Sequence, residues 1–365
     1  MEKLLDIYTD YLLCSTGQTS ATRLSALLDN TVSHDSVTRL LSGSDFSSKV
    51  LWQTVKPLVR AHQSADGCLI FDDTIIEKAH TEESDLIGWH FDHTKGRSVK
   101  GINLLTAFYV TQQKPGDAFL RVPVSYQTIL KPEAHCTVWD KKTHRKSPLT
   151  KNEMLRESVD TAITNGLPFK YVLADTWFAS ADNMAHTASK NKFFVFDMKE
   201  NRLAVPGDAS TGKPNKKADW QNIKSLDIAQ GGSVSVWLKD MDFPVLLTKQ
   251  VFKDEDGNLT GTRFLATNDF GLSDGSSPDI YQKRWSVEEY HKSLKQNAGI
   301  AKSPARTVKT QGNHLFCSLL AYVKLEKIKF ANKLGHFELK AKIYLKALKA
   351  AYAELNSISK QAMPA

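Results

Sequence analysis

Three acidic residues stand where their side chains could share one site. Asp72 follows the apolar run 68–71, and Asp175 follows the apolar run 171–174. In α/β proteins, side chains at the C-terminal ends of strands leave the packed layer and form sites. Glu288 lies instead in a charged segment with helical spacing. Carboxylates from separate elements can hold two Mg²⁺ ions about 3.5–4 Å apart, the arrangement that breaks phosphodiester bonds.

Each aspartate taken alone is weak evidence, because Asp after a strand is often only a turn residue or a helix N-cap. The prediction of a metal site therefore rests on the three acids together. Asp73 competes with Asp72 for the first position. Adjacent residues of a strand point to opposite faces, so we do not expect both to bind one pair of ions. We prefer Asp72 and keep Asp73 as the alternative.

The segment around Glu288 contains further polar residues at helical spacing. Tyr281, Arg284, Glu288 and Lys295 follow one another at intervals of 3, 4 and 7 residues. One continuous helix would place all four on a single face, which is not a core face because it holds one acid, two bases and a phenol. Glu288 would then bind metal, while the other three would bind DNA phosphates. The alternative is an exposed Arg284–Glu288 ion pair that stabilises the helix by roughly 0.3–0.5 kcal/mol.

An α/β framework is expected to position these residues. Strands alternating with a helix indicate such a domain, and turn clusters between strand-like runs indicate a β-rich insertion. The expected elements are strands over residues 102–110, 119–124 and 171–175, a helix over 152–163, and insertion strands over 234–238 and 243–248. After residue 278 the sequence is expected to be helical, with a Lys- and Ala-rich tail.

The first sixty residues predict helices. Apolar residues recur at helical spacing over 21–29, and Ser33 is expected to cap a second helix that reaches Leu41. Two short helices joined by a tight turn suit a helix-turn-helix, in which Thr38 and Arg39 would face a DNA groove. The alternative is a helical hairpin that covers the next domain.

Composition sets the class of partner and the compartment. The net charge of +8 favours a polyanion such as DNA, although a merely basic protein would carry the same charge. The four cysteines are far apart and form no C-x-x-C pair, which is typical of a reducing cytosol rather than of a disulfide framework or a zinc site. The longest apolar runs fall short of the ~20 residues that cross a bilayer. We therefore expect a cytoplasmic protein with no membrane partner.

The spacing Tyr281-x2-Arg284-x3-Glu288-x6-Lys295 resembles the Y-R-E-K group of cut-and-paste DDE transposases from bacterial insertion sequences. The string from Arg284 to Lys292 is similar to that group beyond its four signature positions. The family's Asp-x-Ser/Thr after a strand matches Asp72-Asp73-Thr74, and its second Asp matches Asp175. The resemblance covers roughly residues 65–300.

The resemblance implies an RNase H-like α/β fold in which Asp72, Asp175 and Glu288 hold two Mg²⁺ or Mn²⁺ ions. It implies hydrolysis at transposon ends, a DNA hairpin intermediate and strand transfer into target DNA. The partners would be double-stranded DNA (terminal inverted repeats and target) and a second copy of the chain, at the nucleoid of a bacterial cytoplasm. Relatives receive a flipped base on an aromatic residue of the insertion. Trp220 and Trp237 lie there, but we prefer burial in the insertion's own core for both.

Five segments are therefore expected along the chain. They are a helical DNA-binding domain (1–64), the first part of an RNase H-like core (65–190), a β-rich insertion (191–270), the second part of the core (271–325) and a basic helical C-terminal region (326–365). One alternative function is an RNase H-like nuclease or a domesticated relative that only binds DNA. Another is a helix-turn-helix regulator, which would leave the residues between Tyr281 and Lys295 unexplained.

Overall fold

The computed structural model describes residues 2–139, 142–215 and 217–362. The chain falls into two compact units. Unit 1 comprises residues 1–51, 76–102 and 289–365, and unit 2 comprises residues 52–75 and 103–288. None of the described helices has the length and apolarity that crossing a bilayer requires.

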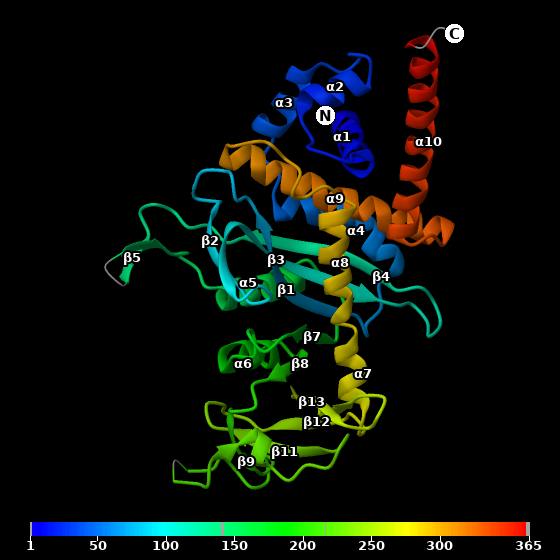
Figure 1. Ribbon diagram of the computed structural model, residues 1–365. Helices are drawn as coiled ribbons and strands as arrows, with labels where there is room; N and C mark the ends of the chain where they lie inside the picture. The colour runs from blue at the N-terminus through cyan, green and yellow to red at the C-terminus, as the bar shows by residue number, and fades with distance from the viewer. Residues whose placement is uncertain (1, 140–141, 216, 363–365) are drawn as a thin grey trace. The chain divides into compact units, whose positions relative to one another are not determined.

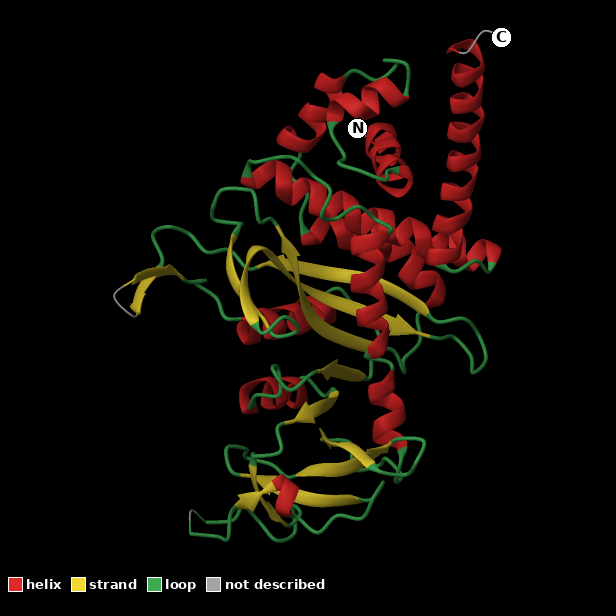
Figure 2. Cartoon of the chain, in the orientation of Figure 1, coloured by secondary structure: helices red, strands yellow, loops and turns green. Residues whose placement is uncertain are grey.

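Unit 2 is built on a mixed β-sheet (Figures 1 and 2). Its strands run in the order β4-β3-β1-β7-β8, and β1, β7 and β8 are parallel. The bounds are β1 Cys68–Glu77, β3 Arg97–Thr111, β4 Leu120–Thr128, β7 Tyr171–Ala174 and β8 Phe193–Met198. The first four residues of β1 and all of β7 are buried, which gives the sheet an apolar centre. The expected strands over 102–110, 119–124 and 171–175 are thus confirmed as β3, β4 and β7. The order is that of an RNase H-like core.

The segment between β8 and α7 extends this same sheet. β13 pairs antiparallel with β8, with Leu265 opposite Asp197, and the order continues outward as β12, β11, β9 and β10. The bounds are β9 Leu203–Pro206, β10 Gln221–Asn222, β11 Ser233–Leu238, β12 Val245–Lys253 and β13 Leu259–Thr267, with a short 3-10 helix η1 at Ile223–Ser225. The expected strands over 234–238 and 243–248 are confirmed as β11 and β12.

Helices of unit 2 pack against the sheet. α5 (Lys151–Thr164) contacts β4 and α6 (Ala181–Ser189), and α6 contacts β8. α5 begins at a capping box, in which the Thr150 side chain accepts from the Glu153 N–H and Glu153 accepts from the Thr150 N–H. The helix expected over 152–163 is therefore confirmed. α4 (Ser48–His62) precedes β1, and β5 (Cys136–Trp139) pairs with β6 (Lys142–Arg145) as a hairpin.

The expectation of one continuous helix over residues 281–295 is wrong. α7 (Ser276–Gln282) ends before Arg284, and α8 (Trp285–Gln296) begins after it. At the junction, the backbone N–H groups of Arg284, Ser286 and Val287 donate to carbonyls three residues earlier rather than four. This tighter winding breaks the period of the α-helix. Glu288 and Lys295 share α8, whereas Tyr281 belongs to α7.

Unit 1 is helical around α9 (Val308–Asn332). α9 contacts α1 (Glu2–Cys14), α3 (His34–Gly43) and α10 (His336–Ala362), and α2 (Ala21–Leu27) contacts α3. The Tyr8 hydroxyl lies 3.0 Å from Nδ1 of His314, so a buried polar contact joins α1 to α9. Strand β2 (Gly88–Asp92) pairs with the first residues of β3 in the same unit.

The second N-terminal helix begins as expected, since the Ser33 side chain accepts from the Ser36 N–H as an N-cap. A turn joins the two helices, where the break between them was expected. Residues 28–33 connect α2 to α3, and Asp29 and Asn30 both adopt left-handed backbone conformations within this loop. Thr38 and Arg39 lie on α3 and are exposed.

Candidate active site

Strand pairing brings the two aspartates together. β1 and β7 are parallel neighbours with Phe71 opposite Ala174, so Asp72 and Asp175 come next on the two strands. Neighbouring strands lie about 4.8 Å apart. The strand residues before both acids are fully buried, which fixes the depth at which each carboxyl group leaves the sheet.

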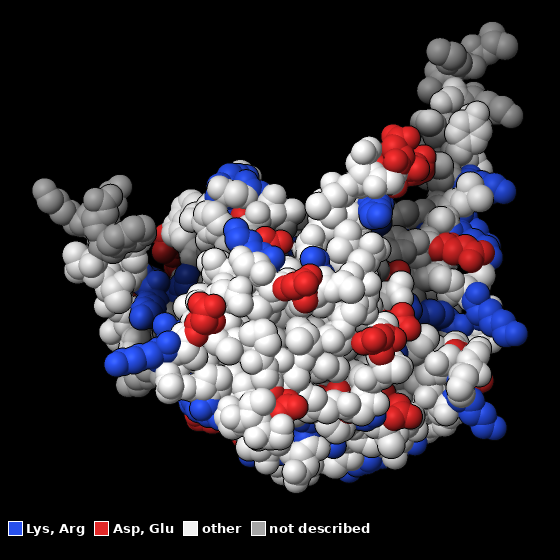
Figure 3. Space-filling model, turned by 90° about the horizontal axis from the view of Figure 1, so that it is seen from below, with Lys and Arg blue, Asp and Glu red and all other residues white. Residues whose placement is uncertain are grey.

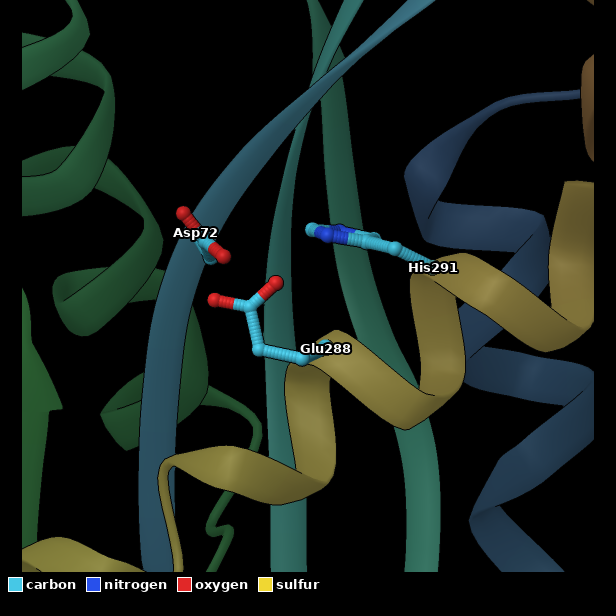
Figure 4. Close-up of side chains that lie close together, drawn as sticks. All are labelled: Asp72, Glu288 and His291. Carbon is cyan, nitrogen blue, oxygen red and sulfur yellow. The ribbon is translucent and has the colours of Figure 1, made fainter. Parts of the chain in front are cut away.

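Helix α8 brings the third acid to Asp72. A carboxylate oxygen of Glu288 lies within 4.8 Å of a carboxylate oxygen of Asp72, and Figure 4 shows the two groups pointing toward one another. Among the described residues, the group that meets this 4.8 Å limit does not include Asp175. Asp175 is close enough for its charge to raise the pKa of Asp72. His291 follows Glu288 one turn later on α8 and is buried.

The electrostatics of the acids are those of a cation site. Burial raises the pKa of Asp72 well above its ordinary value, and the charges of Glu288 and Asp175 add to this effect, while Arg284 opposes it. Burial likewise raises the pKa of Asp175, and Arg284 again opposes it. The donors are carboxylate oxygens, the hard ligands that Mg²⁺ and Mn²⁺ prefer. The residues present therefore fit a divalent metal ion.

Arg284 is the cation within reach of these acids. Its Nη1 lies 3.3 Å from Glu288 and 3.9 Å from Asp72. The Arg284 side chain is only 13% exposed, and its Nε is buried without a hydrogen-bond acceptor in the described part of the chain. A buried, unsatisfied donor is costly unless a ligand satisfies it. The position at the α7–α8 junction thus leaves one N–H of the guanidinium for an incoming acceptor.

Asp73 faces a different partner from Asp72. Its Oδ2 accepts from the Lys151 ammonium at 2.7 Å, and its backbone N–H donates to Oδ1 of Asp72 at 2.9 Å. Lys151 also lies over the ring of Trp177, 5.4 Å from the centroid. An ion-paired Asp73 is less available to a metal ion, so this geometry supports the preference for Asp72.

The two outer residues of the Tyr281–Lys295 segment have different environments. Tyr281 is 3% exposed, and the guanidinium groups of Arg284 and Arg263 lie 5.6 and 5.2 Å from its ring centroid. The Tyr281 ring therefore packs against the guanidinium groups of both arginines. Lys295 is exposed on α8, two turns after Glu288.

Unit 2 contains a fourth acid and a partner arginine that were not predicted from the sequence. Asp197 lies on β8, where burial raises its pKa to about 6, opposed by Arg263 and Arg284. Its Oδ2 lies 3.6 Å from Nε of Arg263. A single Asp within the apolar strand 193–198 could have indicated this acid. No sequence pattern indicates Arg263, because only the pairing of β13 with β8 brings it to Asp197.

Arg263 also lines a cavity of about 440 Å³ in unit 2. Its guanidinium lies 5.0 Å from the ring centroid of Phe252 and 5.2 Å from that of Tyr281. The cavity is lined by Gln250, Phe252, Arg263, Pro278, Asp279, Tyr281, Gln282, Arg284 and Trp285. Aromatic rings and hydrogen-bonding groups thus share a space next to Arg284, the cation beside Asp72 and Glu288.

Trp237 lies inside the core of the insertion. It is 5% exposed, and its indole N–H donates to the carbonyl of Asp208 at 3.1 Å. Trp220 is half-buried, and its indole N–H donates to the carbonyl of Asn215 at 3.3 Å. For Trp237, the preferred expectation of core packing agrees with this burial.

Charge does not gather into one area on the face shown in Figure 3. Acidic and basic side chains are intermingled there. The net charge of +8 therefore does not by itself mark a path for DNA on that face.

An aspartate within β1, a second directly after β7 and a glutamate on α8, all on an RNase H-like sheet, define a class of enzymes that break phosphodiester bonds with divalent metal ions. A family model described as a DDE superfamily endonuclease matches residues 1–221, and another described as a transposase DDE domain matches residues 138–324. The chain belongs to the family of DDE transposases.

No curated protein matches the chain. Among solved structures, the Drosophila P element transposase strand transfer complex matches with 16% sequence identity and a TM-score of 0.25. The match covers 51% of this chain and 36% of the other, so the chain aligns with little more than a third of that transposase chain.

Proposed function

We propose that this protein cleaves DNA at the two ends of a transposable element and joins those ends to a target. The observation that supports this function is the meeting of Asp72 and Glu288 next to Asp175 on the neighbouring strand. We assign the binding of two Mg²⁺ or Mn²⁺ ions to these three carboxylates. When bound, the ions activate the attacking oxygen and stabilise the leaving oxygen.

Residues of the Tyr281–Lys295 segment hold the DNA backbone. Arg284 offers its buried Nε–H to a phosphate oxygen, and its charge lies beside both Asp72 and Glu288. Lys295, which is exposed on α8, binds a phosphate as a charged donor. Tyr281 acts through the arginines that rest on its ring rather than through its buried hydroxyl.

The cavity beside Arg284 suits an unpaired base during hairpin formation. A strand that folds back on itself must place a base outside the helix, and an extrahelical base is held by stacking and edge hydrogen bonds. Phe252 and Trp285 are 36% and 64% exposed at this cavity, and Arg263 is held between Phe252 and Tyr281. We therefore propose a cut-and-paste route with a hairpin intermediate, and we assign the base to this cavity rather than to the buried Trp237.

DNA recognition is assigned in part to unit 1. Thr38 and Arg39 are exposed on α3, as a helix entering a groove requires. Two ends must be cut and joined together, so we propose a homodimer on DNA, acting at the nucleoid in the cytoplasm.

The test uses labelled duplexes that carry the inverted repeats flanking the coding sequence, with and without Mg²⁺. Glu288→Gln should lower cleavage by roughly 10²–10³-fold, which corresponds to about 3–4 kcal/mol of barrier. Glu289→Gln, the adjacent acid on α8, is the matched control and should cleave nearly as wild type. Equal cleavage by Glu288→Gln and wild type contradicts the site. Equal cleavage of duplexes without the repeats supports a general nuclease instead.

The hairpin step has its own readout. Phe252→Ala and Trp285→Ala should lower hairpin yield and leave the first nick unchanged, as measured on denaturing gels. An equal loss of hairpin yield in Trp237→Phe would contradict the assignment of the unpaired base to this cavity.

A further inference from the structure

The β2–β3 hairpin of unit 1 has one buried and one exposed face. On β2, Trp89 and Phe91 are 53% and 54% exposed, whereas His90 between them is 7% exposed. On β3, Val99 is buried at 3%. Alternation along the two strands therefore places both aromatic rings on the face away from the core.

A basic residue lies across from one of these rings. Lys100 is directly opposite Trp89 in the strand register, Ser98 is opposite Phe91, and Arg97 is opposite Asp92. Directly opposite residues share a face of the sheet, so Lys100 lies beside Trp89. Arg97 is exposed where the hairpin turns.

The hairpin is held in one conformation. The Trp89 indole N–H donates to Glu83 at 2.7 Å, and the Phe91 ring meets the His93 ring edge-on at 4.9 Å. Lys95 in the turn bonds Glu77 at 2.6 Å, which ties the turn to β1.

Backbone contacts also hold the end of the hairpin opposite its turn. The Lys78 N–H donates to the Lys100 carbonyl at 2.9 Å. A Cβ on Gly101 would lie 2.4 Å from the Ile76 carbonyl oxygen, so only glycine allows this approach of the two backbones. The aromatic face is thus ordered before any partner arrives, which lowers the entropic cost of binding.

We propose that this face binds unpaired DNA, with two successive bases stacked on Trp89 and Phe91 and the backbone held by Lys100. Residues two apart on a strand are about 6.6–7 Å apart, and pairs of aromatic residues on sheets stack successive bases at such spacing. The inference rests on the proposed function, which separates DNA strands at each cleaved end.

Charge decides between DNA and an apolar protein partner. A protein interface of this kind is depleted of charge at its centre. Here Lys100 lies across from Trp89, on the same face of the hairpin. Exposed aromatic rings beside a basic residue are the combination that binds single strands through stacking and phosphate contacts.

The experiment measures binding of fluorescently labelled oligo(dT) to the full chain by anisotropy, in EDTA so that no cleavage occurs. Trp89→Ala with Phe91→Ala should weaken binding at least about tenfold, since stacking contributes roughly 1–3 kcal/mol per base. Trp89→Phe should restore most of the loss. Phe270→Ala, which removes an aromatic side chain of similar exposure (50%), is the control and should bind as wild type.

Lys100→Gln should reduce the slope of log affinity against log salt by about 0.7, the value for one single-strand phosphate that is no longer neutralised. The proposal is overturned if the double alanine variant binds oligo(dT) like Phe270→Ala while its thermal unfolding matches wild type. Failure of the proposed function is separate, because Glu288→Gln removes cleavage and should leave oligo(dT) binding in EDTA unchanged.

Discussion

Asp72→Asn should stabilise the metal-free protein while removing its response to metal. Asp72 and Glu288 have carboxylate oxygens no more than 4.8 Å apart, a repulsion of about 3.5 kcal/mol at an effective dielectric constant of about 20. Arg284 at 3.9 Å returns about 4 kcal/mol by the same formula. These two terms nearly cancel, so the cost of burying the Asp72 charge remains.

The direction of the pKa shift of Asp72 supports the same conclusion. The pKa of Asp72 is raised in the folded state, mainly by burial. A raised carboxyl pKa contributes stability only at low pH, and that contribution is lost as the pH rises through the folded pKa. At neutral pH, the ionised Asp72 therefore opposes folding. We expect Asp72→Asn to gain about 0.5–2 kcal/mol, the usual gain when a strained functional group is removed.

In the presence of metal, wild type should become more stable than Asp72→Asn. An ion present at about 100 times its Kd stabilises the folded state by about 2.7 kcal/mol. For a chain of 365 residues, that corresponds to a rise in Tm of about 3–4 °C. Wild type should show this rise in MnCl₂, and Asp72→Asn should not.

The assay is thermal unfolding followed by circular dichroism, in EDTA and in MnCl₂. Asp73→Asn is the control: it loses the ion pair with Lys151, so its Tm in EDTA should fall slightly, and its response to metal should remain. The reasoning is refuted if Asp72→Asn is less stable than wild type in EDTA. If Asp73→Asn loses the metal response and Asp72→Asn keeps it, Asp73 is the ligand.

Two further predictions concern unit 2. Trp237→Ala should destabilise the protein by about 3–5 kcal/mol in urea unfolding, because it leaves a cavity where a buried ring was packed. Trp237→Phe should destabilise it less. Equal stability of Trp237→Ala and wild type would contradict the core role of Trp237. Asp197, with its folded pKa raised to about 6, favours folding below pH 4 and loses that contribution as the pH rises through about 6. Wild type should therefore lose up to about 3 kcal/mol relative to Asp197→Asn between pH 4 and 7, and parallel Tm–pH profiles would exclude this effect.

The framework of the site was predictable because its signals are local. Asp72 and Asp175 each end an apolar run, and burial of those runs in adjacent strands explains why they meet. Ser33 and the capping box at Thr150 follow from hydrogen bonds within a few residues. Such contacts depend only on neighbouring side chains.

What could not be predicted depends on long-range pairing or on backbone winding. Arg263 reaches Asp197 only because β13 pairs with β8. The 3-4-7 spacing from Tyr281 to Lys295 is the same whether or not the helix is broken, so this spacing could not predict the α7–α8 junction. The break before α3 was expected, but α2 ends at Leu27 rather than at Asp29, because Asp29 and Asn30 adopt left-handed conformations that their side chains permit without requiring.

The pairing of β13 with β8 has a consequence for protein engineering. The insertion is not a separate module placed on a finished enzyme, because it supplies the hydrogen-bond partner of an edge strand of the central sheet. A miniaturised variant made by joining β8 directly to α7 would leave the backbone of 193–198 as an open, apolar edge. Exposed edges of this kind recruit strands from other molecules. Such a variant would therefore aggregate unless a designed strand or inward-facing charges covered β8.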